Sequence, residues 1–360
     1  MFSNHFIKIR SFLLFAVSFL SVDTFAQKDS SSKITFSAYG ELYYSYDFSE
    51  PANHEKSSFL YNHKRHNEIN ANLLMLKASY NDKKYRANLA LMYGNFPQYN
   101  MTTEPSWARN IYEANVGVRL SEKQKIWIDA GIMPSHIGFE SAISADCWTL
   151  TRSLLAENSP YYEAGIKLSY ASKRDKWNFS LLYLNGWQRI QKPDFIQRPS
   201  FGMQATYKPN NKFMFNYSNF IGTDKPDSMN AFRHFHNLYL QYEPSEKLGI
   251  IAGFDIGSEK INKTKNGIWY SPVLILRHQI KDKFRVAVRG EYYHDQEQII
   301  IFTGIPAGFR TYGVSSNFDV DLSKHIQLRV EGKMLQSRDK IFPNNMSNNY
   351  SVTTNLTIKL

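Results

Sequence analysis

Hydrophobic and polar residues alternate along most of the chain that follows Lys33. In residues 34–48 the even positions are mostly apolar or aromatic, whereas the odd positions include Thr35, Glu41 and Asp47. The same split recurs in residues 85–91, 112–120, 126–132, 162–170 and 350–360. Because successive side chains of a β-strand point to opposite faces, this period of two predicts a long series of strands with one apolar and one polar face.

The connections between the predicted strands alternate in length. Seven are tight polar turns: Asn81–Lys84, Ser121–Gln124, Ser172–Lys176, Pro209–Lys212, Pro244–Lys247, Lys281–Lys283 and Leu322–His325. Eight are long: Ser49–Asn67, Pro97–Arg109, Ser135–Ser159, Gln188–Arg198, Thr223–Phe232, Ser258–Asn266, Asp295–Ala307 and Gln336–Asn348. Fifteen connections join sixteen strands and leave both termini on the short-turn side. This predicts an all-β fold, a single antiparallel transmembrane β-barrel with short periplasmic turns and long extracellular loops.

The length and chemistry of the strands distinguish this barrel from a soluble β-sandwich or propeller. The predicted strands run for about 11 to 14 residues, which is long for a globular protein and suits a tilted membrane crossing. Aromatic residues lie near the strand ends on the apolar face, where interfacial girdles belong: Tyr46, Phe48, Tyr93, Tyr162, Tyr170, Trp177, Tyr183, Tyr207, Phe213, Tyr217 and Tyr242. The strand that begins near Glu68 is apolar on both faces, so we expect a bulge there.

The polar face is dense in charge, which a water-filled lumen tolerates and a packed core does not. The predicted pore-lining residues are Arg86, Glu113, Arg119, Asp129, Glu163, Lys167, Arg277, Arg285, Arg289, Glu291, Arg329 and Glu331.

Composition adds the cellular context. The 360 residues are 42% apolar and 15% aromatic, which excludes a disordered chain, and the longest apolar run is half of the roughly 20 residues that a membrane helix needs. Residues 1–26 combine Lys8 and Arg10, an apolar stretch and a small-residue cleavage site, which predicts a secretory signal peptide before a barrel domain at 27–360. Removing this segment leaves 41 basic and 31 acidic residues, a net charge of +10. The single Cys147 excludes a disulfide framework.

Several segments carry a resemblance to a known family. They are DAGIMPSHIGFE at 129–140, WTLTRS at 148–153, AENSPYY at 156–162, HKRHN at 63–67 and RANLALMYG at 86–94. The chain is similar to the OmpL-like β-barrel porin family of Bacteroidota outer membranes over essentially its whole mature length. The resemblance implies an integral outer-membrane porin and implies no catalytic residues.

The long loop Ser135–Ser159 is the predicted constriction. It follows the fifth strand, and in general sixteen-stranded porins that loop folds inward and narrows the pore. Residues 144–156 are compatible with a helix, and charged groups at a narrow waist set the local field. The candidate constriction residues are Asp146, Trp148, Arg152 and Glu157. The alternative is an exposed loop that packs on its neighbours.

The predicted lumen charges are nearly balanced, with ten cations against eight carboxylates. Arg277, Arg285 and Arg289 lie on the polar faces of two adjacent strands and could form a cationic patch that favours anions weakly. The alternative is that Glu291 and its neighbours pair with these cations and leave a neutral wall.

Other chemistry in the sequence has plainer explanations. His63 and His66 lack further ligands at a metal-binding spacing, and Cys147 lacks a recognisable catalytic partner, so we predict no metal, cofactor or catalytic residue. The basic residues are not interleaved with aromatic residues along a groove, which argues against nucleic acid.

The expected partners are outer-membrane lipid and small hydrophilic solutes. The loop cations Lys56, Lys64 and Arg65 are candidates for binding lipopolysaccharide phosphate. The sequence is compatible with both a monomer and a homo-oligomer. The leading function is a passive diffusion porin, because sixteen strands leave room for an aqueous channel. The alternative is an outer-membrane barrel enzyme of the phospholipase kind, or an adhesin, that uses the barrel as a scaffold.

Overall fold

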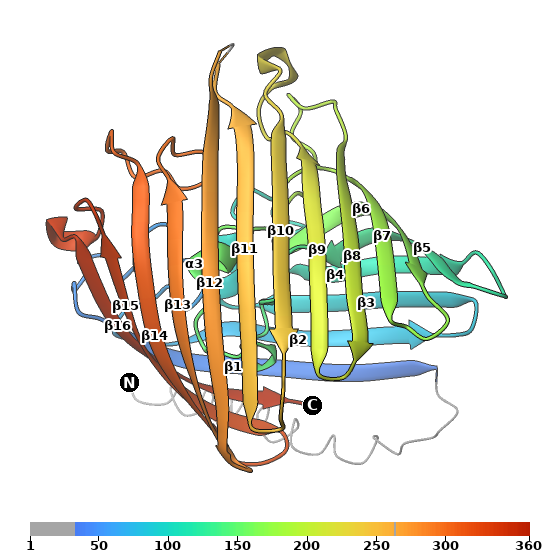
Figure 1. Cartoon of the computed structure of the whole chain (residues 1–360), viewed down its shortest axis with the longest axis horizontal. Helices are drawn as coiled ribbons and strands as arrows, with labels where there is room; N and C mark the ends of the chain where they lie inside the picture. Colours follow the sequence, from blue (N-terminus) through green and yellow to red (C-terminus); the bar gives the residue numbers. More distant parts are fainter. Residues whose placement is uncertain (1–32, 263) are drawn as a thin grey trace, which may run out of the picture. The chain divides into compact units, whose positions relative to one another are not determined.

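The computed structural model describes residues 33–262 and 264–360, and within these residues sixteen strands form a closed antiparallel barrel (Figure 1). Residues 36–360 form one compact unit. The predicted signal peptide at 1–26 lies outside the described residues. No helix in the described part of the chain is long and apolar enough to cross a bilayer.

The strands follow one another around the barrel in chain order. They are β1 (Ile34–Asp47), β2 (Ile69–Asn81), β3 (Tyr85–Tyr93), β4 (Ile111–Arg119), β5 (Lys125–Pro134), β6 (Tyr162–Ala171), β7 (Trp177–Leu184), β8 (Ser200–Asn210), β9 (Phe213–Gly222), β10 (Arg233–Tyr242), β11 (Leu248–Lys260), β12 (Asn266–Lys281), β13 (Phe284–Asp295), β14 (Phe309–Asp321), β15 (Ile326–Ser337) and β16 (Asn348–Lys359). Short helices occupy the long loops: α2 (Asn95–Asn100), η2 (Ser144–Asp146), α3 (Leu154–Glu157), η3 (Asp227–Met229) and η4 (Pro343–Asn345).

Each strand pairs with its neighbours in sequence, and β1 closes the ring against β16, with Leu42 opposite Leu356. The predicted strand number and the seven tight turns are confirmed. The predicted lengths are too uniform, since the strands range from 8 residues in β7 to 16 in β12. One such difference lies between β11 and β12. Strand β11 continues to Lys260 and β12 begins at Asn266, so the loop between them is shorter than the predicted 258–266.

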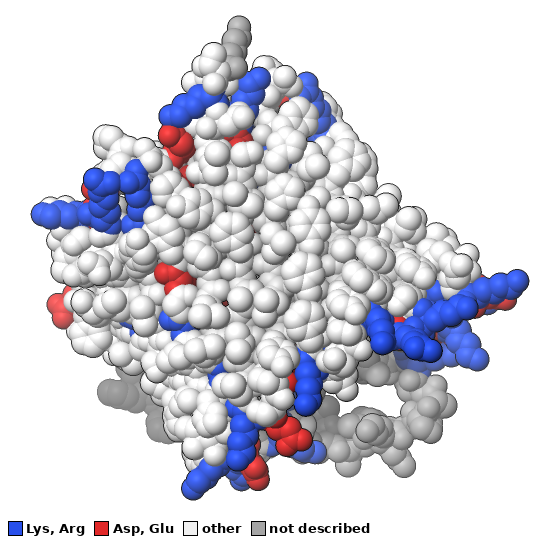
Figure 2. Space-filling model, viewed as in Figure 1, with Lys and Arg blue, Asp and Glu red and all other residues white. Residues whose placement is uncertain are grey.

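The outer face of the barrel is apolar. Leu42, Val116 and Leu356 are between 45% and 63% exposed, whereas the neighbouring Glu41 is fully buried on the inner face. Figure 2 shows the same division, because Lys, Arg, Asp and Glu gather mainly toward the ends of the strands and a broad uncharged surface lies between them. Such a band suits the hydrocarbon core of a bilayer. Tyr162 is an exception to the predicted aromatic girdle: it is 4% exposed, and its hydroxyl donates to Glu104.

Local irregularities explain where the alternation fails. The pairing of β3 with β4 shifts between Ala90 and Leu91, which leaves Tyr112 without an opposite residue. In β2, Asn72 and Leu73 are both buried, so the strand expected to contain an irregularity does break the pattern. Gly131 has a φ of 129°, and a side chain there would collide with the carbonyl of Ala114.

The interior at the long-loop end holds a packed apolar cluster. Its strand members point inward from seven strands and are Leu182, Leu184, Phe220, Phe235, Trp269, Tyr293, Phe309 and Leu335. Its loop members are Phe59, Leu60, Ile137, Leu154, Ile301 and Phe342. The sequence predicts a lumen lined by polar side chains, whereas the structure fills part of this end with apolar contacts between the wall and the loops.

Candidate functional site

The loop between β5 and β6 lies against the inner wall of β13, β14 and β15. The backbone N–H of Leu150 donates to Asn317 at 3.0 Å, that of Thr151 to Glu331 at 2.6 Å and that of Leu154 to Glu291 at 2.6 Å. All three acceptors are inward-facing side chains of the strands. Since these bonds join positions more than 130 residues apart, they fix the loop across the interior.

A buried charge network provides the strongest part of this attachment. The guanidinium of Arg289 lies 2.8 Å from Glu331 and donates to the carbonyl of Thr151 at 2.7 Å. Lys333 lies 3.0 Å from Glu291 and donates to the carbonyl of Arg152 at 3.1 Å. Because the Arg289, Glu331 and Glu291 side chains are 0% exposed and Lys333 is 5% exposed, each charge depends on its partner.

Glycines on β11 make room for aromatic side chains, two of them from the loop and one, over Gly257, from Trp269 of β12. Gly249, Gly253 and Gly257 are spaced by four and all face inward. A Cβ atom at Gly249 would collide with the Trp148 ring, and one at Gly253 would lie 2.7 Å from the Phe139 ring. Arg277 covers the Trp148 ring, with its guanidinium carbon 4.1 Å from the ring centroid. The inner wall therefore has a surface shaped for this loop.

The start of the loop is attached to the other side of the barrel. His136 Nδ1 lies 2.8 Å from Glu163 of β6, and its Nε2 lies 2.8 Å from the carbonyl of Asn219 in β9. Burial by itself lowers the pKa of His136, but the Glu163 carboxylate and the carbonyl of Asn219 together raise it more, so the net pKa lies above the ordinary value. The charged imidazole is thus stabilised where the chain leaves β5 for the interior.

The four predicted constriction residues occupy different environments. Asp146 is 44% exposed and pairs with Lys359 at 2.5 Å, and Trp148 is 8% exposed between β11 and Arg277. Arg152 is fully buried and donates to the carbonyls of Ser141, Ala142 and Leu150. Glu157 is 5% exposed and accepts from the backbone N–H groups of Tyr61 and Asn62. Arg152 and Glu157 therefore hold loops together, and Asp146 presents the most accessible charge of the four.

The loop conformation also differs from the predicted helical run over 144–156. Only η2 and the one-turn α3 are helical, and the segment between them is irregular. The Ser153 side chain caps α3 by accepting from the N–H of Ala156, and its hydroxyl also contacts Glu140. Side-chain acceptors from β13, β14 and β15 replace the internal bonds that a longer helix would make.

The predicted pore-lining residues divide into two groups by exposure. Seven are 6% exposed or less: Glu113, Asp129, Glu163, Arg289, Glu291, Arg329 and Glu331. Five are partly exposed: Arg86, Arg119, Lys167, Arg277 and Arg285. Loop 135–159 and side chains on neighbouring strands cover the first group, so these charged residues bind other parts of the protein and are largely shielded from water. In the second group, Arg86, Arg119 and Arg285 lie next to the short-turn ends of their strands, whereas Lys167 lies opposite Asp129 of β5.

The predicted cationic patch is neutralised by carboxylates. Arg277 lies 3.0 Å from Glu243, Arg285 lies 2.6 Å from Asp321, and Arg289 binds the buried glutamates described above. This agrees with the alternative of a paired wall. The sequence pattern indicated the face on which these arginines lie, but it did not reveal their partners.

A different pair of cations lacks such neutralisation. Arg119 donates only to the carbonyls of Glu122 and Gln124, and Lys167 has no carboxylate within 4.0 Å among the described residues. Arg119 lines a hollow of about 420 Å³ on the inner wall, with Trp127, Ser169 and Asn178.

The loop cations predicted to bind lipopolysaccharide are not free surface charges. Lys56 and Lys64 are 5% and 4% exposed, and burial lowers the pKa of each to about 8. Arg65 lies 2.8 Å from Glu68. Lys56 donates to Ser45 of β1 and Lys64 to the carbonyl of Ser57, so all three cations have partners within the loop 48–68 or on the strands beside it.

The residues weighed for metal or nucleophile chemistry have structural partners. His63 lies 2.7 Å from the buried Glu41, and burial raises the pKa of the Cys147 thiol. Among residues 33–262 and 264–360, no group of three or more His, Cys, Asp and Glu side chains is arranged to hold a metal ion.

Sequence reasoning missed the residues that attach the loop. His136, Glu140 and Thr151 lie in the predicted loop, but their partners are on distant strands. The glycines of β11 did carry a signal, since three glycines at a spacing of four on one strand face leave space for large side chains.

Comparisons with known proteins agree with this architecture. Residues 33–360 match a family described as "Putative beta-barrel porin-2, OmpL-like". No curated protein matches the sequence significantly.

Several solved structures share the fold. An anion-selective porin from Comamonas acidovorans aligns with a TM-score of 0.61 at 10% identity, over 91% of this chain and 99% of that chain. OmpT of Vibrio cholerae aligns with a TM-score of 0.58 at 8% identity, over 91% and 97% of the two chains. The outer-membrane channel DcaP of Acinetobacter baumannii aligns with a TM-score of 0.57 at 9% identity, also over 91% and 97%. At such identities the likeness establishes a common fold.

Proposed function

Because the chain belongs to the OmpL-like β-barrel porin family, we propose that it forms a water-filled channel for passive diffusion of small hydrophilic solutes across the outer membrane. The observation that carries the proposal is the attachment of loop 135–159 to the inner wall of a sixteen-stranded barrel. A strand ring of this size leaves an aqueous interior, and a loop held inside it reduces the bore. We propose a transport role and no catalytic one.

The proposed size limit comes from loop 135–159 together with the apolar cluster at the long-loop end. The loop takes up space along β11–β15, so the remaining passage runs beside it. Asp146 of the loop and Lys359 of β16 form an accessible charge pair. We propose Asp146 and Trp148 as constriction residues, with Arg152 and Glu157 as the residues that hold the loop in shape.

The proposed charge preference is weak and favours anions. It rests on Arg119 and Lys167, which have no carboxylate within 4.0 Å among the described residues, and not on the paired Arg277, Arg285 and Arg289. Unpaired cations beside water concentrate anions, and salt screens the effect. The structural neighbour from Comamonas acidovorans is an anion-selective porin, which is consistent with this preference.

The proposal extends to export and assembly. Residues 1–26 have the composition of a cleavable signal peptide, which fits delivery to the outer membrane. A structure of OmpT from Vibrio cholerae is described as a trimer form, and we propose a homo-oligomer for this chain as well. We propose outer-leaflet lipopolysaccharide as a neighbour of the apolar outer face, and a Bacteroidota source from the sequence resemblance.

Liposome swelling tests the proposed function. Vesicles that contain the purified protein should swell at rates that fall steeply with the size of an uncharged polyol, and vesicles without protein should not swell. Reversal potentials across a KCl gradient should have the sign of anion preference, and Lys167→Gln with Arg119→Gln should move them toward zero. Swelling no faster than in empty vesicles would contradict a diffusion channel, and cation selectivity would contradict the charge assignment.

A further inference from the structure

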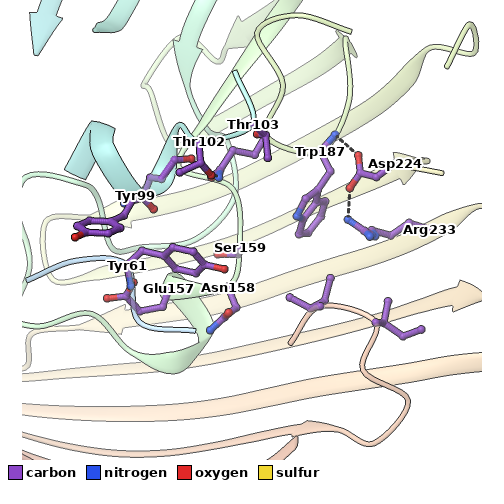
Figure 3. Close-up of a pocket in the computed structure, with 14 residues that line it drawn as sticks. Tyr61, Tyr99, Thr102, Thr103, Glu157, Asn158, Ser159, Trp187, Asp224 and Arg233 are labelled. Carbon is purple, nitrogen blue, oxygen red and sulfur yellow. Dashed lines mark hydrogen bonds and ion pairs between the residues drawn. The ribbon is translucent and has the colours of Figure 1, made fainter. Parts of the chain in front are cut away.

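A pocket of about 280 Å³ opens among the long loops next to the C-terminal end of loop 135–159 (Figure 3). It is lined by residues from several loops, from α2 and α3, and from the first residue of β10. The Tyr61 and Trp187 rings project toward the same hollow, and Thr102, Thr103, Asn158 and Ser159 surround it. Its volume is slightly below the range of about 300 to 1,000 Å³ that is typical of small-molecule sites.

The apolar part of the pocket is aromatic and is held in place from behind. Trp187 makes edge contacts with Phe220 and Phe235 of the apolar cluster, with ring centroids 5.1 and 4.9 Å apart. Ile299 and Ile300 line the pocket and also pack against that cluster. The guanidinium carbon of Arg233 also lies over the Trp187 ring, 4.8 Å from its centroid. A ligand in the pocket therefore meets the part of Trp187 that these neighbours leave free, together with Tyr61, Ile299 and Ile300.

The charged groups of the pocket are already neutralised. Arg233 lies 2.7 Å from Asp224 and 2.7 Å from Glu259. Asp224 also accepts from the backbone N–H of Trp187 at 3.3 Å, which ties the aromatic residue to the ion pair. Both an anion and a cation would have to compete with these existing bonds.

Glu157 is committed in the same way. One of its oxygens accepts from the backbone N–H of Tyr61 at 2.8 Å and from that of Asn62 at 3.2 Å. Within the described residues, by contrast, the hydroxyls of Thr102 and Ser159 make no hydrogen bond to the protein. The hydrogen-bonding capacity left in the pocket is neutral.

We propose that this pocket binds a neutral saccharide ring before it passes the inner loop. A sugar ring has apolar C–H faces that can lie against Trp187 and Tyr61, and hydroxyls that can bond with Thr102 and Ser159. The proposal rests on the channel function proposed above and names a solute class for it. Because Glu157, Asn158 and Ser159 directly follow Leu154–Ala156, the bound ring lies beside the segment that attaches to β13.

Saturation-transfer NMR on the purified protein in detergent tests the site independently of conduction. The probe is maltotriose, with glucuronate and glucosamine as an anion and a cation that keep the sugar ring. We expect saturable binding of maltotriose that is stronger than that of either charged probe. Trp187→Ala should raise the half-saturation concentration by about tenfold, the loss of one aromatic contact.

Matched variants separate the site from the fold. Trp107 is a loop tryptophan that is 62% exposed and does not line the pocket, so Trp107→Ala should bind like the wild type. Ser159→Ala with Thr102→Val removes only hydroxyls and should also weaken binding, which covers the case that Trp187→Ala does not fold.

The possible results discriminate between the two proposals. Absence of saturable maltotriose binding, tighter binding of a charged probe, or equal binding by wild type and the hydroxyl variant would overturn the saccharide site. A protein that conducts ions but does not bind maltotriose would overturn this inference alone. A protein that binds maltotriose but does not conduct would contradict the channel function and leave the site in place.

Discussion

The Trp148 ring occupies the space over Gly249 where the Cβ atom of any other residue would lie. The same relationship recurs four residues further along β11, where the Phe139 ring lies over Gly253. Arg277 covers the Trp148 ring. The path of loop 135–159 is therefore built into the sequence of a strand that lies about 100 residues away along the chain.

A larger side chain in place of Gly253 should displace loop 135–159 from the wall. In Gly253→Val, the new Cβ atom would lie 2.7 Å from Phe139 and 3.0 Å from Val273, so the aromatic ring has to move. We expect faster proteolysis within residues 135–159 and a larger single-channel conductance. Gly332→Val on β15 is the control, because a Cβ atom there meets nothing within 4 Å. Identical behaviour of the two variants would show that the glycine surface does not position the loop.

Replacing Arg289 should lower the stability of the fold considerably more than replacing Arg285. Arg289→Met leaves Glu331 buried and short of a partner, which typically costs about 3 to 5 kcal/mol. Arg285→Met on the same strand breaks the partly exposed pair with Asp321, for which about 1 kcal/mol is expected. Unfolding by denaturant in detergent, followed by tryptophan fluorescence, compares the two. A loss for Arg289→Met no larger than for Arg285→Met would contradict the role of the network.

The contact of His136 with Glu163 should make stability depend on pH. The pKa of His136 is raised in the folded protein, so the protonated ring stabilises the fold below the unfolded value of about 6.5. This stabilisation is lost as the pH rises through the raised folded value. The denaturant midpoint of the wild type, minus that of His136→Gln, should therefore be constant well below about pH 6.5 and fall as the pH rises above about 6.5. His325→Gln, in the exposed turn before β15, should keep the wild-type slope, and a constant difference between wild type and His136→Gln would contradict the assignment.

Cys147 is the single cysteine of the chain and reports on the position of the loop. It is 7% exposed, and burial raises the pKa of its thiol, so reaction with a maleimide at neutral pH should be slow. Gly253→Val should accelerate labelling by more than about tenfold if the loop opens, since the thiolate is the reacting species and access to it limits the rate. Mass spectrometry of the labelled protein measures this directly. Fast labelling of the wild type would show that the loop is not packed against the wall.

The fold could be predicted from the sequence because its determinants are local. The period of two places Glu41 inward and Leu42 outward without any knowledge of partners, and tight turns such as Lys281–Lys283 set the pairing of consecutive strands. The failures lie where the backbone departs from this regularity. Tyr162 belongs to the predicted girdle by alternation but is buried with a bond to Glu104 from another loop.

The interior could be predicted only in part, because its contacts are distant in sequence. Alternation placed Arg289 and Glu331 on the inner face, but their burial depends on Thr151, which reaches them from a loop more than 130 residues away. Arg152 has the charge and the loop position expected of a constriction residue, yet its guanidinium donates to carbonyls of its own loop. Charge type alone does not say whether a side chain faces water or a backbone acceptor.

The most direct test of a channel narrowed by loop 135–159 is the single-channel conductance of the purified protein in a planar bilayer. The wild type should give discrete current steps in KCl, and a variant with residues 145–155 replaced by a short Gly–Ser linker should give larger ones. The increase is expected because the variant lacks Trp148, the Arg152 attachments and the bonds of Leu150, Thr151 and Leu154 to β13–β15. Equal conductance of the two proteins would remove the loop from the pore, and absence of current steps in both would contradict a channel.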